Sequence, residues 1–336
     1  MKKIEDKEIL LNIEDLYVQY DTNEGTAYAV NGLNFSIRKG ETFGLVGETG
    51  AGKTTTALSI LKLLPQKVGK ITKGKIEFEG RDIVKLTEDN MRDIRGSHIS
   101  MIFQDPMSSL NPVLTVGDQI AEAIQTHHPD LSNDEVEARV DSVLQLVGIP
   151  ASRKNEYPHQ FSGGMKQRVV IAIALVCEPK LLLADEPTTA LDVTVQNQVL
   201  DMMSNLKRTF DTSMILITHD LGIVCQMCDN VAIMYAGEII EMGSVYDIFD
   251  FDKPHHPYTK GLFGSLPSLQ VDSNRLKPVS GLMPDPMDLP PGCRFNPRCE
   301  CCFDLCTKEA PSVFTNETHS IKCHLYGKTK AGEIQC

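Results

Sequence analysis

Residues 47–54 read Gly-Glu-Thr-Gly-Ala-Gly-Lys-Thr and follow an apolar, strand-like stretch that ends at Val46. Their spacing fits the P-loop pattern, in which a glycine-rich turn joins a strand to a helix. The glycines let successive backbone N–H groups face a phosphate, and the helix N-terminus adds partial positive charge. Lys53 is expected to reach the β- and γ-phosphates of a nucleotide, and Thr54 to bind Mg²⁺. The expected nucleotide contacts are Gly47, Glu48, Thr49, Gly50, Ala51, Gly52, Lys53, Thr54 and Thr55.

A pair of acidic residues follows the apolar run 181–184. Such a run is typical of a strand buried on both faces of a parallel sheet, and it places Asp185 and Glu186 at the carboxyl end of that strand. Asp185 is expected to hold Mg²⁺ through water, and Glu186 to polarise the attacking water in phosphoryl transfer.

A third motif, residues 161–168, reads Phe-Ser-Gly-Gly-Met-Lys-Gln-Arg and lies between the first two. A serine and two glycines that open a helix form an anion site, because the first N–H groups of the helix have no intrahelical partner. Ser162, Gly163 and Gly164 are therefore expected to bind a phosphate.

These three motifs, in this order, resemble those of the ATP-binding cassette (ABC) ATPases. The resemblance implies an α/β fold with a RecA-like parallel sheet core, an antiparallel β subdomain and a helical subdomain, which binds ATP and Mg²⁺ and hydrolyses ATP. The third motif differs from the commonest family spelling, Leu-Ser-Gly-Gly-Gln, at Phe161 and Met165.

The resemblance also implies functional roles outside the three motifs. Gln104 matches the glutamine that contacts Mg²⁺ and the attacking water, and His219 matches the switch histidine that contacts the γ-phosphate. Residues 190–192, Ala-Leu-Asp, resemble the D-loop and add Asp192 to the nucleotide site. Tyr20 is the expected aromatic residue that stacks on adenine, with Tyr28 as the alternative.

The pattern along the chain predicts a nucleotide-binding domain over residues 1–250, with its helical subdomain at about 105–165. Beyond residue 251 the composition becomes proline-rich, which indicates an extended appendage over 251–336. Residues 256–259, His-Pro-Tyr-Thr, and 290–293, Pro-Pro-Gly-Cys, resemble the C-terminal extension of ATPase subunits from dipeptide and oligopeptide importers, a group shared with nickel importers.

The cysteines are concentrated in this extension, which holds seven of the ten within the last 44 residues. In a reducing compartment such a density favours a metal over disulfides. Similar tails in this branch hold a 4Fe-4S cluster, and four thiolates also suit Zn²⁺. The ligands that match the family positions are Cys293, Cys299, Cys306 and Cys323.

Other metal ligands stay open from the spacing alone. Cys299, Cys302 and Cys306 also form a plausible set, with Cys301 beside them. His319 and His324 are of a type that suits zinc.

Composition sets the remaining limits. The chain has 336 residues, of which 41% are hydrophobic and 23% charged, as expected for a globular protein with two or three cores. Its formal net charge of -12 disfavours nucleic acid as a partner. The longest apolar run, residues 169–177, is far shorter than the roughly 20 residues that span a bilayer, and residues 1–10 contain no signal-like apolar segment. The sequence thus predicts a cytoplasmic chain.

The resemblance implies several protein partners. In ABC ATPases the Ser-Gly-Gly motif of one subunit covers ATP held by the P-loop of another, so we expect a second ATPase subunit, which in this branch is usually a different chain. The insert between Gln104 and Ser162 is where the family docks two transmembrane permease subunits, and an extracytoplasmic solute-binding protein acts indirectly.

The expected function is ATP-driven uptake of dipeptides or oligopeptides, as a peripheral subunit at the cytoplasmic face of the cell membrane. Nickel or another small solute is the alternative cargo. A soluble, non-transport ABC ATPase is disfavoured, because the chain has one P-loop and no long heptad run.

Overall fold

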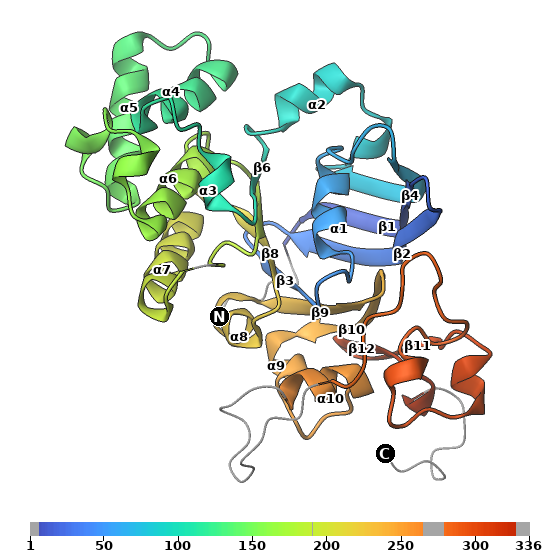
Figure 1. Cartoon of the computed structure of the whole chain (residues 1–336). Coiled ribbons are helices and arrows are strands. Elements are labelled where there is room, and N and C mark those ends of the chain that lie inside the picture. The colour runs from blue at the N-terminus through green and yellow to red at the C-terminus, as the bar shows by residue number, and fades with distance from the viewer. Residues whose placement is uncertain (1–6, 190, 265–278, 327–336) are drawn as a thin grey trace. The chain divides into compact units, whose positions relative to one another are not determined.

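The computed structural model describes residues 7–189, 191–264 and 279–326, and its contacts divide the chain into two compact units. Unit 1 comprises Met1–Leu11, Ile37–Thr42 and Phe78–Ile217, and unit 2 comprises Asn12–Ser36, Phe43–Glu77 and Thr218–Cys336. Each unit therefore assembles segments that lie far apart in the sequence, as the chain colouring in Figure 1 shows.

Unit 1 is built on parallel strands. Strand β7 pairs with β6 on one side and with β8 on the other, with Leu181 opposite both Ile99 and Ser213. Every residue of β7 and β8 is buried, as expected for strands covered on both faces. These parallel strands are β6 (Ile99–Ile102), β7 (Leu181–Asp185) and β8 (Ser213–Thr218).

The helices of unit 1 gather around α6, which contacts α3, α4, α5 and α7 as well as β6. Helices α3 to α5 occupy the segment in which the sequence predicts helices, and α4 and α5 lie side by side in Figure 1. Helix α5 begins with a capping box between Ser132 and Glu135, which satisfies its first N–H groups. The helices are α2 (Glu88–Ile94), α3 (Pro106–Ser109), α4 (Val116–His127), α5 (Asn133–Leu146), α6 (Gly163–Leu175) and α7 (Val193–Thr209), and a two-residue strand β5 (Arg81–Asp82) precedes them.

Unit 2 contains two groups of paired strands. In the first, β1 lies between β2 and β4. In the second, β9 is parallel to β3 and antiparallel to β10, which in turn pairs with the hairpin of β11 and β12. The strands are β1 (Ile9–Asp21), β2 (Thr26–Arg38), β3 (Thr42–Val46), β4 (Gly69–Phe78), β9 (Asn230–Tyr235), β10 (Glu238–Ser244), β11 (Val313–Asn316) and β12 (His319–Lys322). The helices are α1 (Lys53–Ile60), α8 (Leu221–Met227), α9 (Val245–Ile248) and α10 (Pro257–Phe263).

The segment beyond residue 251 differs from the extended appendage that its composition indicates. It contains helix α10 and the β11–β12 hairpin, and β12 pairs antiparallel with β10 through Glu241 opposite Ile321. His319 and Ile321 are buried while the residues between and after them are half-buried, a two-residue alternation too short to stand out in the sequence.

Helix α1 ends at Ile60, before the proline at position 65. Lys62 adopts a left-handed φ of 50°, and the Leu63 N–H donates to the Leu58 carbonyl at 2.8 Å. Together with the bond from the Lys62 N–H to the Ser59 carbonyl, this forms a Schellman motif that closes the helix.

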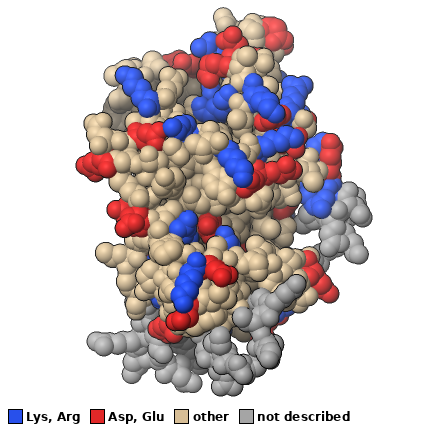
Figure 2. Space-filling view, turned by 90° about the vertical axis from the view of Figure 1, so that its right-hand side faces the viewer, with Lys and Arg blue, Asp and Glu red and all other residues tan. Residues whose placement is uncertain are grey.

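The distribution of charged side chains and the lengths of the described helices are those expected of a globular protein. Figure 2 shows acidic and basic side chains intermixed over the viewed face rather than separated by sign. Among the helices of the described residues, none combines the length and the apolar character that a bilayer crossing requires.

Candidate nucleotide-binding and catalytic site

The P-loop in unit 2 has glycine where the backbone leaves no room for a side chain. A Cβ atom on Gly47 would lie 2.3 Å from the Met234 carbonyl oxygen, and one on Gly52 would lie 2.4 Å from that of Ala29. Gly52 also has a φ of 100°, a value that other residues rarely adopt. The backbone of the loop therefore packs directly against the backbones of β2 and β9.

Lys53 lies over the carbonyl groups of this loop. Its ammonium group is buried and donates to the carbonyl oxygens of Gly47, at 2.6 Å, and of Glu48, at 3.0 Å. From this position the ammonium group can exchange neutral acceptors for the oxygens of a phosphate.

The two tyrosines considered for adenine stacking have different surroundings. The Tyr20 hydroxyl lies 3.2 Å from that of Thr55, in helix α1 directly after the P-loop. The Tyr28 side chain is 45% exposed, and its backbone N–H donates to the Pro286 carbonyl. Tyr20 is thus the tyrosine joined to the P-loop helix, and its stacking role stays a prediction.

Unit 1 brings together two of the expected catalytic residues, Gln104 and Glu186. Glu186 follows the buried Asp185 at the end of β7 and has a left-handed φ of 46°, which is unusual for a residue with a side chain. Its carboxylate accepts hydrogen bonds from the Gln104 amide and from the Thr189 hydroxyl, both at 2.9 Å. Thr189 is not among the residues expected from the sequence, although its place three residues after Glu186 is the available signal.

The two glycines of the Ser-Gly-Gly motif have different structural roles. A Cβ atom on Gly163 would meet open space, whereas one on Gly164 would lie 2.5 Å from Val195 in helix α7. Ser162 caps helix α6 by accepting from the Met165 N–H at 3.4 Å. Gly164 is therefore required for helix packing, and Gly163 leaves the helix N-terminus open to a ligand.

Phe161 and Met165, the two positions that differ from the common family motif, both contact Arg153. The Arg153 guanidinium lies 4.4 Å from the ring centre of Phe161 and donates to the Met165 sulfur at 3.4 Å. An arginine bound to Glu156 thus packs against both positions at once.

Asp192 and His219 belong to different units. Asp192 caps helix α7 by accepting from the Val195 N–H at 3.0 Å, whereas Ala190 lies outside the described residues. His219 is exposed and directly follows β8. Unit 1 therefore holds Gln104, Asp185, Glu186, Asp192 and the Ser-Gly-Gly motif, and unit 2 holds Tyr20, the P-loop and His219.

The thiols of the C-terminal extension influence one another. Burial raises the pKa of Cys323 to about 12, and the nearby thiols of Cys293, Cys299 and Cys306 add to the rise. Burial likewise raises the pKa of Cys299 to about 11, with Cys293 and Cys306 again contributing. Such thiols stay neutral unless a nearby cation compensates the charge of the thiolate.

A compact group of potential metal-binding atoms among the described residues lies outside this cysteine set. It consists of Glu241, His255 and His319, whose donor atoms lie within 4.8 Å of one another. His324, the other histidine considered for zinc, contacts the Glu309 carbonyl through its Nε2. The cysteine ligand set stays a prediction.

The Glu241 carboxylate is the centre of a buried hydrogen-bond network that sequence analysis missed. One oxygen contacts His255 Nδ1 at 2.6 Å and His319 Nε2 at 2.9 Å. The other accepts from the His256 N–H at 2.8 Å and from the Thr259 hydroxyl at 2.6 Å. Because its oxygens already have four partners, the group is a structural junction between β10, β12 and the start of α10.

The pKa values of this network follow from burial and hydrogen bonding. Burial raises the pKa of Glu241, but hydrogen bonds from His255, His319 and Thr259 outweigh it and hold the value at about 2. The pKa of His255 is raised: burial lowers it, but the hydrogen bonds to Glu241 and to the Asp250 carbonyl, together with the attraction of the Glu241 charge, outweigh burial. Burial lowers the pKa of His256 to about 4, so this ring is neutral and accepts from the Tyr258 N–H.

Comparison with known proteins extends the similarity along the chain. The ABC transporter family model matches residues 30–189, and the model of the oligopeptide/dipeptide transporter C-terminal region matches residues 240–306. The dipeptide transport ATP-binding protein DppD of Bacillus subtilis is 50% identical over 95% of this chain and 95% of its own. The oligopeptide transport ATP-binding protein OppD of Escherichia coli is 47% identical over 90% of this chain and 89% of its own.

Solved structures give the same family. CbiO1 of Clostridium perfringens, part of the ABC transporter complex cbiONQ, matches with a TM-score of 0.64 and 31% identity, over 73% of this chain and 92% of that one. The dimeric ATP-binding cassette MJ0796, bound to ADP and phosphate, matches with a TM-score of 0.63 and 26% identity, over 70% of this chain and 99% of that one. The chain therefore belongs to the ABC ATPases, in the family of the ATP-binding subunits of dipeptide and oligopeptide transporters.

Proposed function

We propose that this chain is the ATP-hydrolysing subunit of a dipeptide or oligopeptide importer. The observation that carries the proposal is the 50% identity to a dipeptide transport protein over 95% of both chains, which includes the C-terminal region as well as the nucleotide-binding part. We assign residues 1–250 to nucleotide binding, with the helical subdomain at about 105–165, and residues 251–336 to a family-specific extension.

In the proposed mechanism, Glu186 accepts a proton from the water that attacks the γ-phosphate. The hydrogen bonds from Gln104 and Thr189 fix the orientation of its carboxylate. Lys53 and the N–H groups of the P-loop bind the phosphates, and His219 contacts the γ-phosphate.

The residues proposed for Mg²⁺ fit that ion, because Asp185, Thr54 and Gln104 offer the oxygen atoms that it prefers. Bound Mg²⁺ would offset negative charge on the phosphates. Asp185 is almost fully buried, so the orientation of its carboxylate as a ligand is restricted.

A second ATPase subunit completes the site in this proposal, because Ser162, Gly163 and Gly164 would cover ATP bound to the partner. The dimeric state of the cassette MJ0796 supports this arrangement. We further propose two permease subunits, a solute-binding protein that acts indirectly, and a peripheral position at the cytoplasmic face of the membrane.

The test of cargo is reconstitution of the full transporter in liposomes with its solute-binding protein. We expect dipeptides or oligopeptides to accumulate and to stimulate ATP hydrolysis. A complex with the Glu186→Gln subunit is the control for ATP dependence. Stimulation by Ni²⁺ with no response to peptides would contradict the peptide assignment.

We also propose that Cys293, Cys299, Cys306 and Cys323 hold a 4Fe-4S cluster. Four partly or fully buried thiols form a donor set suited to such a cluster.

Anaerobically purified protein is expected to contain about four iron and four sulfide ions per chain. Cys306→Ser should lose this content, because a hydroxyl does not replace a thiolate ligand. Cys225→Ser is the matched control, since Cys225 is an exposed cysteine of helix α8, outside the extension, and should leave the content unchanged. If the protein contains one zinc ion and no sulfide, the four cysteines form a zinc site instead of a cluster. If it contains neither iron nor zinc, the proposed ligand set is wrong.

A further inference from the structure

The C-terminal extension contacts the P-loop through Arg298 and Tyr258. The Arg298 guanidinium forms a two-point ion pair with the Glu48 carboxylate, at 3.1 and 3.2 Å. The Glu48 backbone N–H donates to the Tyr258 hydroxyl at 3.1 Å. Both partners therefore act on the residue that follows the first glycine of the P-loop.

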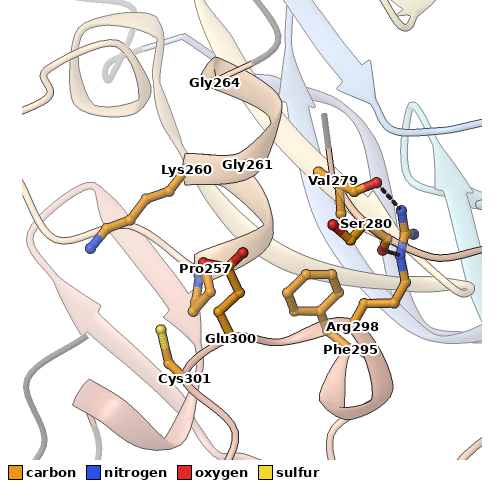
Figure 3. Close-up of a pocket in the computed structure, with 10 residues that line it drawn as sticks. All are labelled: Pro257, Lys260, Gly261, Gly264, Val279, Ser280, Phe295, Arg298, Glu300 and Cys301. Atoms are coloured by element: carbon orange, nitrogen blue, oxygen red, sulfur yellow. Dashed lines mark hydrogen bonds between the residues drawn. The ribbon is translucent and has the colours of Figure 1, made fainter. Parts of the chain in front are cut away.

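Arg298 is held rigidly in this position. Its side chain is only 5% exposed, and its other N–H groups donate to the backbone carbonyl oxygens of Ser280, at 2.8 Å, and Val279, at 3.3 Å, and to the Tyr235 hydroxyl, at 3.4 Å. Figure 3 shows the bonds to Ser280 and Val279 on one wall of a pocket about 300 Å³ in volume. A buried, multiply bonded guanidinium loses little further freedom when it pairs with a carboxylate.

Aromatic rings support the same contact. Tyr235, Tyr258 and Phe295 pack edge-to-face with ring centres 4.8 to 5.5 Å apart, and the Arg298 guanidinium lies 5.7 Å from the centre of Tyr235. Tyr258 is fully buried, and burial raises its pKa, so its hydroxyl stays neutral. The extension thus presents a preformed surface to Glu48.

The charge at position 48 gives this contact a consequence for nucleotide binding. The N–H groups and lysine of a P-loop attract the negative phosphates of ATP, and a carboxylate in the same loop repels them. The two-point pair with Arg298 cancels the charge of Glu48. Without Arg298, a half-exposed negative charge would remain in the loop.

We propose that the C-terminal extension sets the ATP affinity of the P-loop, with Arg298 as a positioning residue that neutralises Glu48 and Tyr258 as a positioning residue that holds the Glu48 N–H. The inference rests on the proposed phosphate-binding role of the P-loop. It gives the extension a function in the ATPase cycle that does not depend on which metal its cysteines bind.

The test uses the full chain and measures the dissociation constant for ATP with Mg²⁺, together with KM and kcat in the assembled transporter. Arg298→Met is expected to weaken ATP binding and raise KM about tenfold, with kcat nearly unchanged, because Glu186 and Gln104 are untouched. Tyr258→Phe should raise the dissociation constant about threefold, since it removes one neutral acceptor.

Rescue separates this role from general destabilisation. Glu48→Gln removes the charge that Arg298 neutralises, so the double variant Glu48→Gln with Arg298→Met should bind ATP nearly as well as Glu48→Gln alone. Arg294→Met is the matched control, because Arg294 lies in the same extension and its contacts, to the Pro290 carbonyl at 2.6 Å and to Glu238 at 3.8 Å, lie outside the P-loop. It should leave ATP affinity unchanged.

Several outcomes would overturn the inference. If Arg298→Met is folded and binds ATP as the wild type does, the ion pair between Arg298 and Glu48 does not set ATP affinity. The same conclusion follows if Arg298→Met weakens ATP binding as much in the Glu48→Gln background as in the wild type. If Arg298→Met does not fold, Arg298→Lys applies the same test: it keeps the charge but not the two-point geometry, and it should weaken binding about threefold. Wild-type protein that binds no ATP would instead overturn the proposed function.

Discussion

Glu186→Gln is expected to lower the ATP turnover of the assembled transporter about 10²- to 10⁴-fold while ATP binding is retained. Glutamine keeps the size of the side chain and an oxygen that accepts the hydrogen bonds of Gln104 and Thr189. It cannot accept the proton of the attacking water, so hydrolysis loses its base. Phosphate release measures turnover, and retention of ATP on the purified complex measures binding.

Glu178→Gln is the matched control for this substitution. Glu178 precedes strand β7 as Glu186 follows it, is exposed, and has a similar left-handed φ, 52° against 46°. A change of charge at this end of the strand should leave turnover unchanged. Retention of more than about a tenth of wild-type turnover by Glu186→Gln would contradict the assigned role.

Glu241→Gln is expected to reduce the free energy of unfolding by about 3 kcal/mol or more. Both ring nitrogens of His255 contact acceptors, the Glu241 carboxylate at 2.6 Å and the Asp250 carbonyl at 2.8 Å. The geometry is satisfied when both nitrogens carry protons, so the pair consists of a buried imidazolium and a carboxylate. A glutamine leaves that positive charge uncompensated and places an amide N–H against existing donors.

Chemical denaturation of the full chain measures this loss. Glu238→Gln is the control, since Glu238 lies on the same strand and pairs with Lys322 at 2.7 Å but is less buried. It should cost about 1 kcal/mol or less. Equal effects of the two substitutions would show that the Glu241 network adds nothing beyond an ordinary ion pair.

The difference between wild type and Glu241→Gln should depend on pH. The pKa of Glu241 is about 2 in the folded chain against a usual 4.5, so its contribution of about 3 kcal/mol is complete above pH 4.5 and is lost as the pH falls toward 2. The pKa of His255 is raised from its usual 6.5, so its contribution is complete below pH 6.5 and is lost as the pH rises through the raised value. Denaturation curves should therefore differ most between pH 4.5 and 6.5, and a constant difference from pH 3 to 8 would contradict the pairing.

The parts of the site that are local in sequence could be predicted. The strand before Gly47, the glycine positions and the acidic pair at the end of β7 follow from spacing, because a tight phosphate-binding turn allows few residue types. The pairing of Gln104 with Glu186 follows only from resemblance, since 82 residues separate them.

The contacts of the extension could not be predicted in this way. Arg298 and Glu48 are 250 residues apart, and neither belongs to a periodic pattern that indicates a partner. Glu241 lies in a stretch of sequence that reads as one strand of an ordinary hairpin. Its place in the buried hydrogen-bond network depends on His319, which is 78 residues further along. Such long-range polar pairs depend on tertiary packing, which local periodicity does not encode.

The pairing of β12 with β10 also bears on aggregation. A strand without a neighbour exposes a row of N–H and C=O groups that can pair with another copy of the chain. Strand β12 pairs with β10 at Glu241 and Met242, and this side of the sheet then ends in the four-residue strand β11, all of whose residues are exposed. The β11–β12 hairpin therefore protects the paired part of β10 from self-association, and a chain that stops before residue 313 would lose that protection.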